Sequence, residues 1–343
     1  MNNPLIDLIS DTVTKPTPPM LEAMFKAEVG DDVFGEDPTV NKLEALAADM
    51  LGMEAGLYCP SGTQTNQIAI KILTQPQDEV ICDKLSHIYL YESGGMAFNS
   101  GVSVRLINGD RGRISVDQIE ENINPEDPWY PKTSLVSLEN TSNKGGGSYY
   151  TLDEIKKISA FCRSKNLKLH LDGARLFNAL VETGESSREY GKYFDTISIC
   201  ISKGLGAPVG SLLLSSKENI LKARRVRKVF GGGMRQAGYL AAACIYALEN
   251  NIERLKEDHK RARQLGEAIN KLSFVETVLP VDTNILIVNL KKEKTSFDFV
   301  DELKQKGIRS APFGKYSVRF VTHLDFNDEM LEKALHIISE FEK

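Results

Sequence analysis

The chain has 343 residues, of which 41% are hydrophobic and 26% are charged, with 42 Lys and Arg against 47 Asp and Glu. That length predicts about two domains, and the net charge of −5 argues against a protein that mainly binds nucleic-acid phosphates. The sequence offers no apolar run long enough for a membrane helix and no secretory signal pattern. The five cysteines form no C-x-x-C pair, which favours a cytoplasmic setting over a disulfide framework or a zinc site.

Short apolar runs alternate with helical patterns along roughly the first two thirds of the chain. A helix is predicted through 68–73 and another over 153–165. Strands are predicted at 56–59, 80–82, 102–106, 134–138, 168–172, 195–202 and 211–214. This succession predicts an α/β domain with a mainly parallel sheet.

The pattern changes near residue 235, where two long helices are predicted. A shorter series follows them and indicates a smaller α+β domain. The predicted elements are helices at 234–250 and 253–272, a strand at 283–290, a helix at 296–306, a strand at 316–322 and a helix at 327–341. We therefore expect a large domain over 1–250 and a small one over 251–343, with no Pro/Gly/Ser linker marking the boundary.

Polar residues follow the first predicted strand, in the segment CPSGTQTN at 59–66. A small, glycine-containing turn that opens a helix presents free backbone N–H groups, and the helix dipole favours an anion there. Ser61, Gly62 and Thr63 are thus candidates for holding a phosphate group. The alternative interpretation is an ordinary helix N-cap.

Two further strands end in charged residues. Asp172 ends an apolar strand, where a carboxylate is costly unless it is paired, and it is suited to a protonated ring nitrogen or to capping the next helix. Lys203 follows an alternating strand and precedes glycines. A partly desolvated lysine there would be a competent amine nucleophile, although a solvated turn lysine has the same pattern.

The run KARRVRKVFGGGMR at 222–235 is strongly basic. A solvated helix face is the ordinary interpretation of such a run, and in a net acidic protein we expect only one or two of these cations to meet a ligand. A phosphate turn, then a strand-end Asp, then a strand-end Lys is the order of functions that pyridoxal 5′-phosphate (PLP) requires. His87 is a candidate to stack on the ring of that cofactor, or else a buried structural histidine.

Long blocks of the sequence resemble the low-specificity L-threonine aldolases, within the aspartate-aminotransferase-like PLP enzymes. The blocks extend over nearly the whole chain. They are VGDDVFGEDPTV at 29–40, SGTQ at 61–64, SLENT at 137–141, HLDGAR at 170–175, SKGLGAPVG at 202–210 and GGGMRQ at 231–236. The resemblance implies the fold type I of PLP-dependent transferases, with a mainly parallel seven-stranded sheet and a smaller C-terminal α+β domain.

The resemblance also implies roles for individual residues. Lys203 would bind PLP covalently, Asp172 would pair with its pyridine nitrogen, and His87 would stack on its ring; these three are the predicted catalytic residues. The remaining cofactor contacts are expected from Gly62, Thr63, Arg175, Lys228 and Arg235. Ser10, Arg175 and Arg319 would bind the substrate carboxylate, which suits the bidentate geometry of arginine. Ser142 is the remaining expected substrate contact, on the side of the β-hydroxyl.

The implied activity is cleavage of L-threonine or L-allo-threonine to glycine and an aldehyde, in threonine catabolism and glycine biosynthesis. The family assembles as homotetramers, dimers of dimers with active sites at the dimer interface. We expect no nucleic acid, membrane or metal in the reaction, although Thr12, Thr14 and Ser202 leave a structural cation open.

This chain departs from the family at Ser142, where members commonly carry a histidine near the substrate β-hydroxyl. Serine is a poor proton acceptor near neutral pH. His87, or a water near the phosphate, is therefore a candidate for the base. The same departure leaves open an alternative activity, a PLP-dependent β-eliminating lyase or racemase of this fold.

Overall fold

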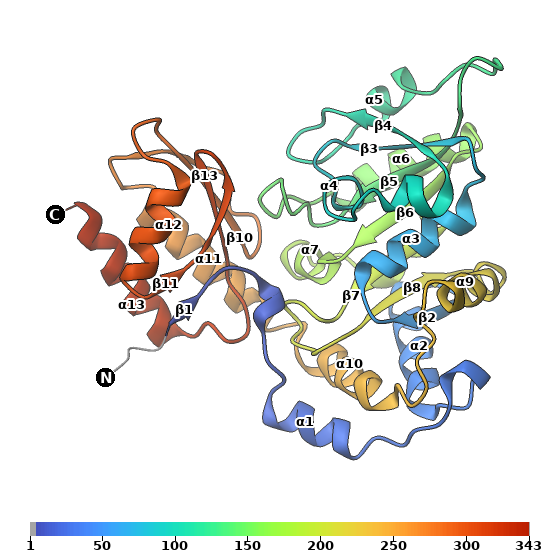
Figure 1. Cartoon of the computed structure of the whole chain (residues 1–343), viewed down its shortest axis with the longest axis horizontal. Helices are drawn as coiled ribbons and strands as arrows, with labels where there is room; N and C mark the ends of the chain where they lie inside the picture. Colours follow the sequence, from blue (N-terminus) through green and yellow to red (C-terminus); the bar gives the residue numbers. More distant parts are fainter. Residues whose placement is uncertain (1–4, 343) are drawn as a thin grey trace.

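A seven-stranded sheet forms the centre of the larger part of the molecule (Figure 1). The computed structural model of the chain describes residues 5–342. Within the sheet β8 runs opposite to the other strands, which are parallel to one another. The strands, in spatial order, are β2 (Ala55–Cys59), β8 (Ser211–Ser215), β7 (Thr196–Cys200), β6 (Lys168–Gly173), β5 (Lys132–Glu139), β3 (Asp78–Asp83) and β4 (Ser103–Ile107).

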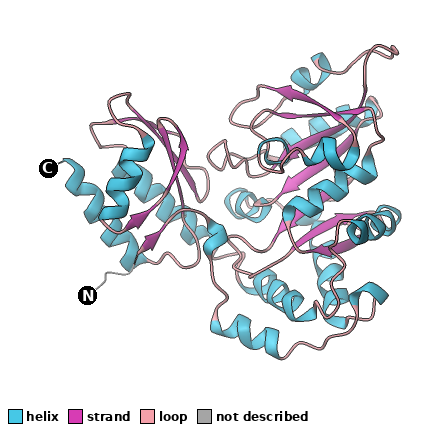
Figure 2. Ribbon diagram, in the orientation of Figure 1, coloured by secondary structure: helices cyan, strands magenta, loops and turns pink. Residues whose placement is uncertain are grey.

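Helices surround this sheet (Figure 2). Two groups are in mutual contact: α10 packs against α1 and α2, and α3 packs against α9. The helices are α1 (Pro18–Phe25), α2 (Pro38–Leu51), α3 (Gly62–Leu73), α4 (His87–Leu90), α5 (Val116–Glu121), α6 (Leu152–Ser164), α7 (Leu176–Thr183), α8 (Ser187–Tyr190), α9 (Lys217–Val229) and α10 (Gly238–Asn250). Short turns of 3₁₀ helix cover Asp11–Val13 and Asp32–Phe34, and a π-helical turn covers Met96–Ser100.

Local sequence sets the helix ends. Asp37 caps α2 by accepting hydrogen bonds from the next two free amides, Pro38 occupies the first helical position, and Gly52 ends the helix in the left-handed conformation. Thr151 and Glu154 form a reciprocal capping box at the start of α6. These caps fix where α2 and α6 begin, and Gly52 fixes where α2 ends.

The C-terminal region is built on a four-stranded antiparallel sheet in the order β12-β13-β10-β9. β1 (Ile6–Asp7) from the start of the chain pairs with β11 here, and Ile6 and Leu8 enter the core of this region (Figure 1). The other elements are α11 (Leu255–Ile269), β9 (Val275–Val278), β10 (Ile285–Leu290), α12 (Ser296–Gln305), β11 (Ile308–Arg309), β12 (Ala311–Gly314), β13 (Ser317–Val321), α13 (Asp328–Ser339) and a 3₁₀ turn at Glu340–Glu342.

The predicted fold class is confirmed, with two local differences. The strand predicted over 195–202 ends at Cys200, so Lys203 lies in the loop beyond it. The helix predicted from 234 begins at Gly238, whose amide donates to Asp37 at 2.8 Å. Among residues 5–342, every helix is too short or too polar to cross a bilayer. The domain boundary stays a prediction.

Candidate active site

The carboxyl ends of the central parallel strands form the edge where such sheets bind ligands. Four polar residues of interest lie at or just beyond these ends: His87, Glu139, Asp172 and Lys203. Glu139 ends β5 and is the register partner of Asp172 near the end of β6. Asp172 in turn pairs with Ser198 on β7, the strand that leads into the Lys203 loop. His87 begins α4 after β3. The predicted sheet therefore brings together residues that are far apart in the sequence.

Asp172 is buried and fixed from two sides. Its Oδ1 accepts from the amide of Ala174 at 3.1 Å, and its Oδ2 accepts from Asn66 Nδ2 at 2.9 Å. Asn66 lies on α3, the helix that begins at the candidate phosphate turn. The carboxylate is thus held rigidly at the position where a ring N–H is expected.

His87 is held through Nδ1, which lies 3.0 Å from Glu92 Oε1. Its ring also contacts Tyr91, with centroids 5.6 Å apart. Burial lowers the pKa of His87, but the Glu92 hydrogen bond and the negative charge of Asp172 outweigh burial and raise the pKa above its ordinary value. One ring nitrogen of His87 and one carboxylate oxygen each of Glu92 and Asp172 lie within 4.8 Å of one another.

Glu139 connects two loops of the site. One carboxylate oxygen accepts from the amide of His87 at 2.7 Å, and the other accepts from the amide of Asn143 at 2.9 Å. Burial and the neighbouring Asp172 raise the pKa of Glu139 to about 7, against the opposite effect of the two amides. Both oxygens accept from backbone amides, so Glu139 links the loop of His87 to the loop of Asn143.

Lys203 is half-buried in the loop after β7. Its backbone carbonyl accepts from Thr14 Oγ1 at 3.2 Å, which ties the loop to the start of the chain. The positive charge of Lys203 contributes to the lowered pKa of Asp11 and partly opposes the rise in the pKa of His87. Lys203 therefore belongs to the region in which a bound cofactor would lie against His87.

Arg175 and Arg319 form the cationic side of the site. Arg175 makes a bidentate ion pair with Asp11, at 2.7 and 2.6 Å. Arg319 donates to Asn143 Oδ1 at 2.8 Å and to the Ile9 carbonyl at 3.0 Å. Burial and the nearby charge of Arg175 lower the pKa of Arg319, which places the two guanidinium groups in one electrostatic neighbourhood.

The first turn of α3 fits the phosphate of PLP. Ser61 caps the helix by accepting from the Gln64 amide at 3.2 Å, and the preceding amides of Gly62 and Thr63 are not used by intrahelical bonds. A Cβ at Gly62 would lie 2.5 Å from Cys200 Sγ, so only glycine fits the turn here. The turn, the fixed Asp172 and the loop lysine together match the donor set that PLP requires.

The other predicted residues lie around this centre. Ser10 accepts from the Thr12 amide, at the turn that carries Asp11. The Ser142 hydroxyl accepts from the Gly145 amide at 3.2 Å, and its side chain faces Gly112, so it is turned into its own loop. Lys228 packs beside Gly233, and Arg235 pairs with Asp31 at 2.9 Å on the surface.

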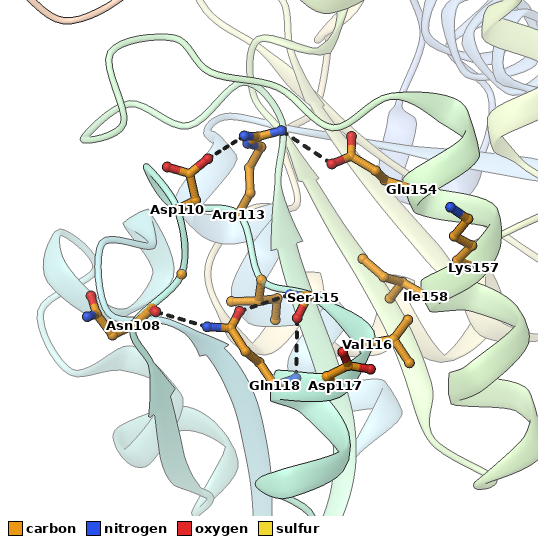
Figure 3. Close-up of a pocket in the computed structure, with 12 residues that line it drawn as sticks. Asn108, Asp110, Arg113, Ser115, Val116, Asp117, Gln118, Glu154, Lys157 and Ile158 are labelled. Carbon is orange, nitrogen blue, oxygen red and sulfur yellow. Dashed lines mark hydrogen bonds and ion pairs between the residues drawn. The ribbon is translucent and has the colours of Figure 1, made fainter.

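Sequence reasoning missed Asp11, Asn66, Glu92 and Glu139 as site residues. Glu139 carried a usable signal, because it directly follows the predicted strand 134–138 just as Asp172 ends its own strand. The other three have no local signature; their roles arise from long-range pairing. A separate open hollow, shown in Figure 3, lies where Arg113 bridges Asp110 and Glu154, and none of the predicted site residues lines it.

Comparisons with known proteins identify the family of the chain. The profile of the beta-eliminating lyase family matches residues 7–293. The low specificity L-threonine aldolase of Escherichia coli is 43% identical over 336 residues, covering 97% of this chain and 98% of that protein. The low-specificity L-threonine aldolase 1 of Arabidopsis thaliana is 40% identical, covering 93% and 91%, and the Saccharomyces cerevisiae enzyme is 38% identical, covering 97% and 86%.

Solved structures show the same fold. A Leishmania major threonine aldolase superposes with a TM-score of 0.85 at 22% identity, covering 98% of this chain and all of that one. A serine palmitoyltransferase of Sphingomonas wittichii has a TM-score of 0.76 at 19% identity, covering 98% and 87%. With sequence identity of this extent over nearly the full length of its relatives, the chain belongs to the low-specificity L-threonine aldolase family, within the beta-eliminating lyases.

Proposed function

We propose that the protein is a PLP-dependent carbon–carbon lyase that cleaves L-threonine and L-allo-threonine to glycine and acetaldehyde. The observation that carries the proposal is the rigid Asp172, held by Ala174 and Asn66 at the same sheet edge as Lys203. The relatives named aldolases support the choice of reaction. They do not favour the alternative of a β-eliminating lyase or racemase.

Each part of the site has a share in holding the cofactor. PLP, when bound, supplies an aldehyde that joins the substrate amine and a ring that draws electrons from the Cα bonds. Lys203 provides the amine that anchors it, and the amides of Gly62 and Thr63 hold its phosphate. Asp172 would pair with the ring nitrogen, and His87 would stack on the ring. Arg175 would be the partner of the phenolic oxygen.

The substrate carboxylate is assigned to Arg319 and Arg175, with Ser10 beside them. Arg319 is aimed by Asn143 and by the Ile9 carbonyl, and one of its buried atoms, Nε, has no hydrogen-bond partner among the described residues. A buried donor without a partner is costly, and a carboxylate would satisfy it. A direct role of Ser142 at the hydroxyl is less well supported, because its side chain hydrogen-bonds within its own loop.

His87 is the proposed acceptor of the β-hydroxyl proton. Its Nδ1 is engaged by Glu92, while Nε2 has no hydrogen-bond partner among the described residues. Glu139, whose pKa burial raises to about 7, has both oxygens engaged by amides. A water held near the phosphate is the competing acceptor, and replacing His87 with Phe distinguishes the two by loss or retention of cleavage.

We further propose a cytoplasmic homotetramer, a dimer of dimers that breaks down threonine and supplies glycine. Phe34 is 71% exposed and packs near the guanidinium of Arg235, a residue that follows the end of α9 that carries Lys228. Exposed aromatic and apolar residues next to cations suit a protein interface. Lys228 and Arg235 would then reach a cofactor through that interface. Sedimentation velocity on wild type and on Phe34→Asp measures the assembly, and a monomeric wild type would refute it.

The test of the reaction is product analysis. Purified protein with PLP is given L-threonine and L-allo-threonine separately, and glycine and acetaldehyde are measured. We expect both products from the wild type. We expect Lys203→Ala to release neither product and to lose the covalent retention of PLP. Pyruvate and ammonia from serine without glycine from either threonine would favour the elimination reaction instead.

A further inference from the structure

Asn66 connects two buried carboxylates of the site. Its Nδ2 lies 2.9 Å from Glu92 Oε1 and 2.9 Å from Asp172 Oδ2. An amide nitrogen carries two protons, one for each carboxylate, whereas the amide oxygen in this place would face two acceptors. The orientation of the Asn66 side chain is therefore fixed by its neighbours.

The same orientation sets the state of the histidine behind it. Asn66 Oδ1 lies 3.1 Å from His170 Nε2, so that ring nitrogen must donate. His170 Nδ1 then accepts from Thr196 Oγ1 at 2.8 Å. Burial lowers the pKa of His170 to about 4, which agrees with a neutral ring. Asn66 is thereby anchored in the sheet through β6 and β7.

Glu92 completes the connection to the cofactor face. Its side chain is fully buried and accepts from three groups: His87 Nδ1, Asn66 Nδ2 and Gln67 Nε2, the last at 2.6 Å. Three donors satisfy an ionised carboxylate, and that carboxylate keeps a proton on His87 Nδ1. A single chain of hydrogen bonds thus runs from His87 through Glu92 and Asn66 to Asp172.

We propose that Asn66 and Glu92 are positioning residues that act together, and we call this pair the bracket. The bracket fixes His87 and Asp172 relative to one another, and these two residues make the contacts with the cofactor. This bracket rests on the proposed function, because it presumes that PLP occupies the site. Neither residue needs to touch the substrate. Their effect is transmitted through hydrogen bonds to the residues that face the cofactor, as in other sites where outer partners orient the primary contacts.

Isosteric variants test the bracket. Asn66→Asp places a third carboxyl between two acceptors, and Glu92→Gln removes the charge that holds His87. Asn219→Asp is the matched control, since the side chain of Asn219, on α9, donates to Ser215 Oγ and contacts neither carboxylate of the bracket. We expect the PLP dissociation constant to rise about tenfold in both bracket variants, because each loses a hydrogen bond to a charged group, and to stay unchanged in the control.

A second readout follows the His87 ring by NMR titration of histidine-labelled holoprotein. Charged and titratable groups around the ring are Glu92, Glu139, Asp172, Lys203 and Tyr91. With Glu92→Gln the His87 midpoint should fall by roughly one pH unit. Should the variants fail to fold, wild type alone decides: a His87 midpoint at or below its ordinary value overturns the bracket.

Unchanged PLP affinity and an unchanged His87 midpoint in both folded variants also overturn it. The bracket and the proposed function fail in different ways. Wild-type protein that binds PLP with the expected titration but releases no glycine refutes the reaction and leaves the bracket standing. Glycine release by variants that keep wild-type PLP affinity and His87 titration refutes the bracket alone.

Discussion

Asp11 and Arg175 form a buried bidentate ion pair that joins the start of the chain to the loop after β6. Burial raises the pKa of Asp11, but the ion pair outweighs burial and lowers the pKa well below its ordinary range. Asn284 adds a third contact to Asp11 at 3.3 Å. Because Asp11 neighbours Ser10 and the loop lysine, this pair sets the geometry of the carboxylate-binding side.

Replacing Asp11 with Ala should destabilise the fold by about 3 kcal/mol, since an arginine is left buried without its partner. The KM for threonine should rise as well, because Arg175 loses its orientation. The control is Asp7→Ala, which breaks a more exposed pair with Arg309 and should cost about 1 kcal/mol or less. Urea unfolding measures both, and equal losses in the two variants would contradict the assignment.

Glu139 predicts a pH dependence in the cofactor-free protein. Its pKa is raised to about 7 by burial and by Asp172, so the folded state binds a proton that the unfolded state releases near 4.5. The stabilising contribution is complete below 4.5 and is lost as pH rises through 7. Glu139→Gln should remove this loss, on the order of 2 kcal/mol between pH 5 and 8.

Unfolding free energies at several pH values measure the effect of Glu139. The surface variant Glu276→Gln serves as the control and should run parallel to wild type. If the Glu139→Gln and wild-type curves are also parallel across this range, Glu139 does not carry a raised pKa and the account of its burial beside Asp172 is incorrect.

His170 predicts the opposite trend at lower pH. Burial lowers its pKa to about 4, so the unfolded state takes up a proton near 6.5 that the folded state refuses. Stability is complete above 6.5 and is lost as pH falls through 4. In wild type the Glu139 and His170 effects partly cancel between pH 4.5 and 6.5. His170→Asn should reduce the slope of the unfolding free energy against pH on the acid side, by the amount that corresponds to one proton. An unchanged acid slope would argue against a neutral buried His170.

The sequence predicted the central features of this site because strand ends are readable from local patterns. Asp172 and Lys203 each follow an apolar run, and the parallel arrangement brings such ends to one edge. Asp11, Asn66 and Glu92 escaped prediction for a physical reason. Each is ordinary in its local context, and each gains its role only when folding brings it against a polar or charged partner more than twenty residues away.

The C-terminal region illustrates the same limit. Its helices and longer strands follow hydrophobic periodicity, and they lie near the predicted positions. β1 is two residues long and carries no such pattern, yet it pairs with β11 across 302 positions, as Ile6 with Ile308. Short strands that are stabilised by a distant partner leave little trace in the local sequence.

The neighbours Asn143 and Ser142 give the last prediction, since they face different ways from one loop. Asn143 Oδ1 accepts from Arg319, whereas the Ser142 hydroxyl accepts from the Gly145 amide within the loop. Asn143→Ala should raise the KM for threonine about three- to tenfold with little change in kcat, because the variant loses the one hydrogen bond by which Asn143 orients the carboxylate-binding arginine.

Ser142→Ala should change KM and kcat by less than about twofold, because a loop hydroxyl contributes little to a distant reacting atom. The two alanine variants control for each other, as they alter adjacent residues of similar burial in the same loop. Steady-state kinetics with both threonine diastereomers distinguishes them. A large fall in kcat for Ser142→Ala, with Asn143→Ala near wild type, would place Ser142 at the substrate hydroxyl and would require the loop to rearrange when substrate binds.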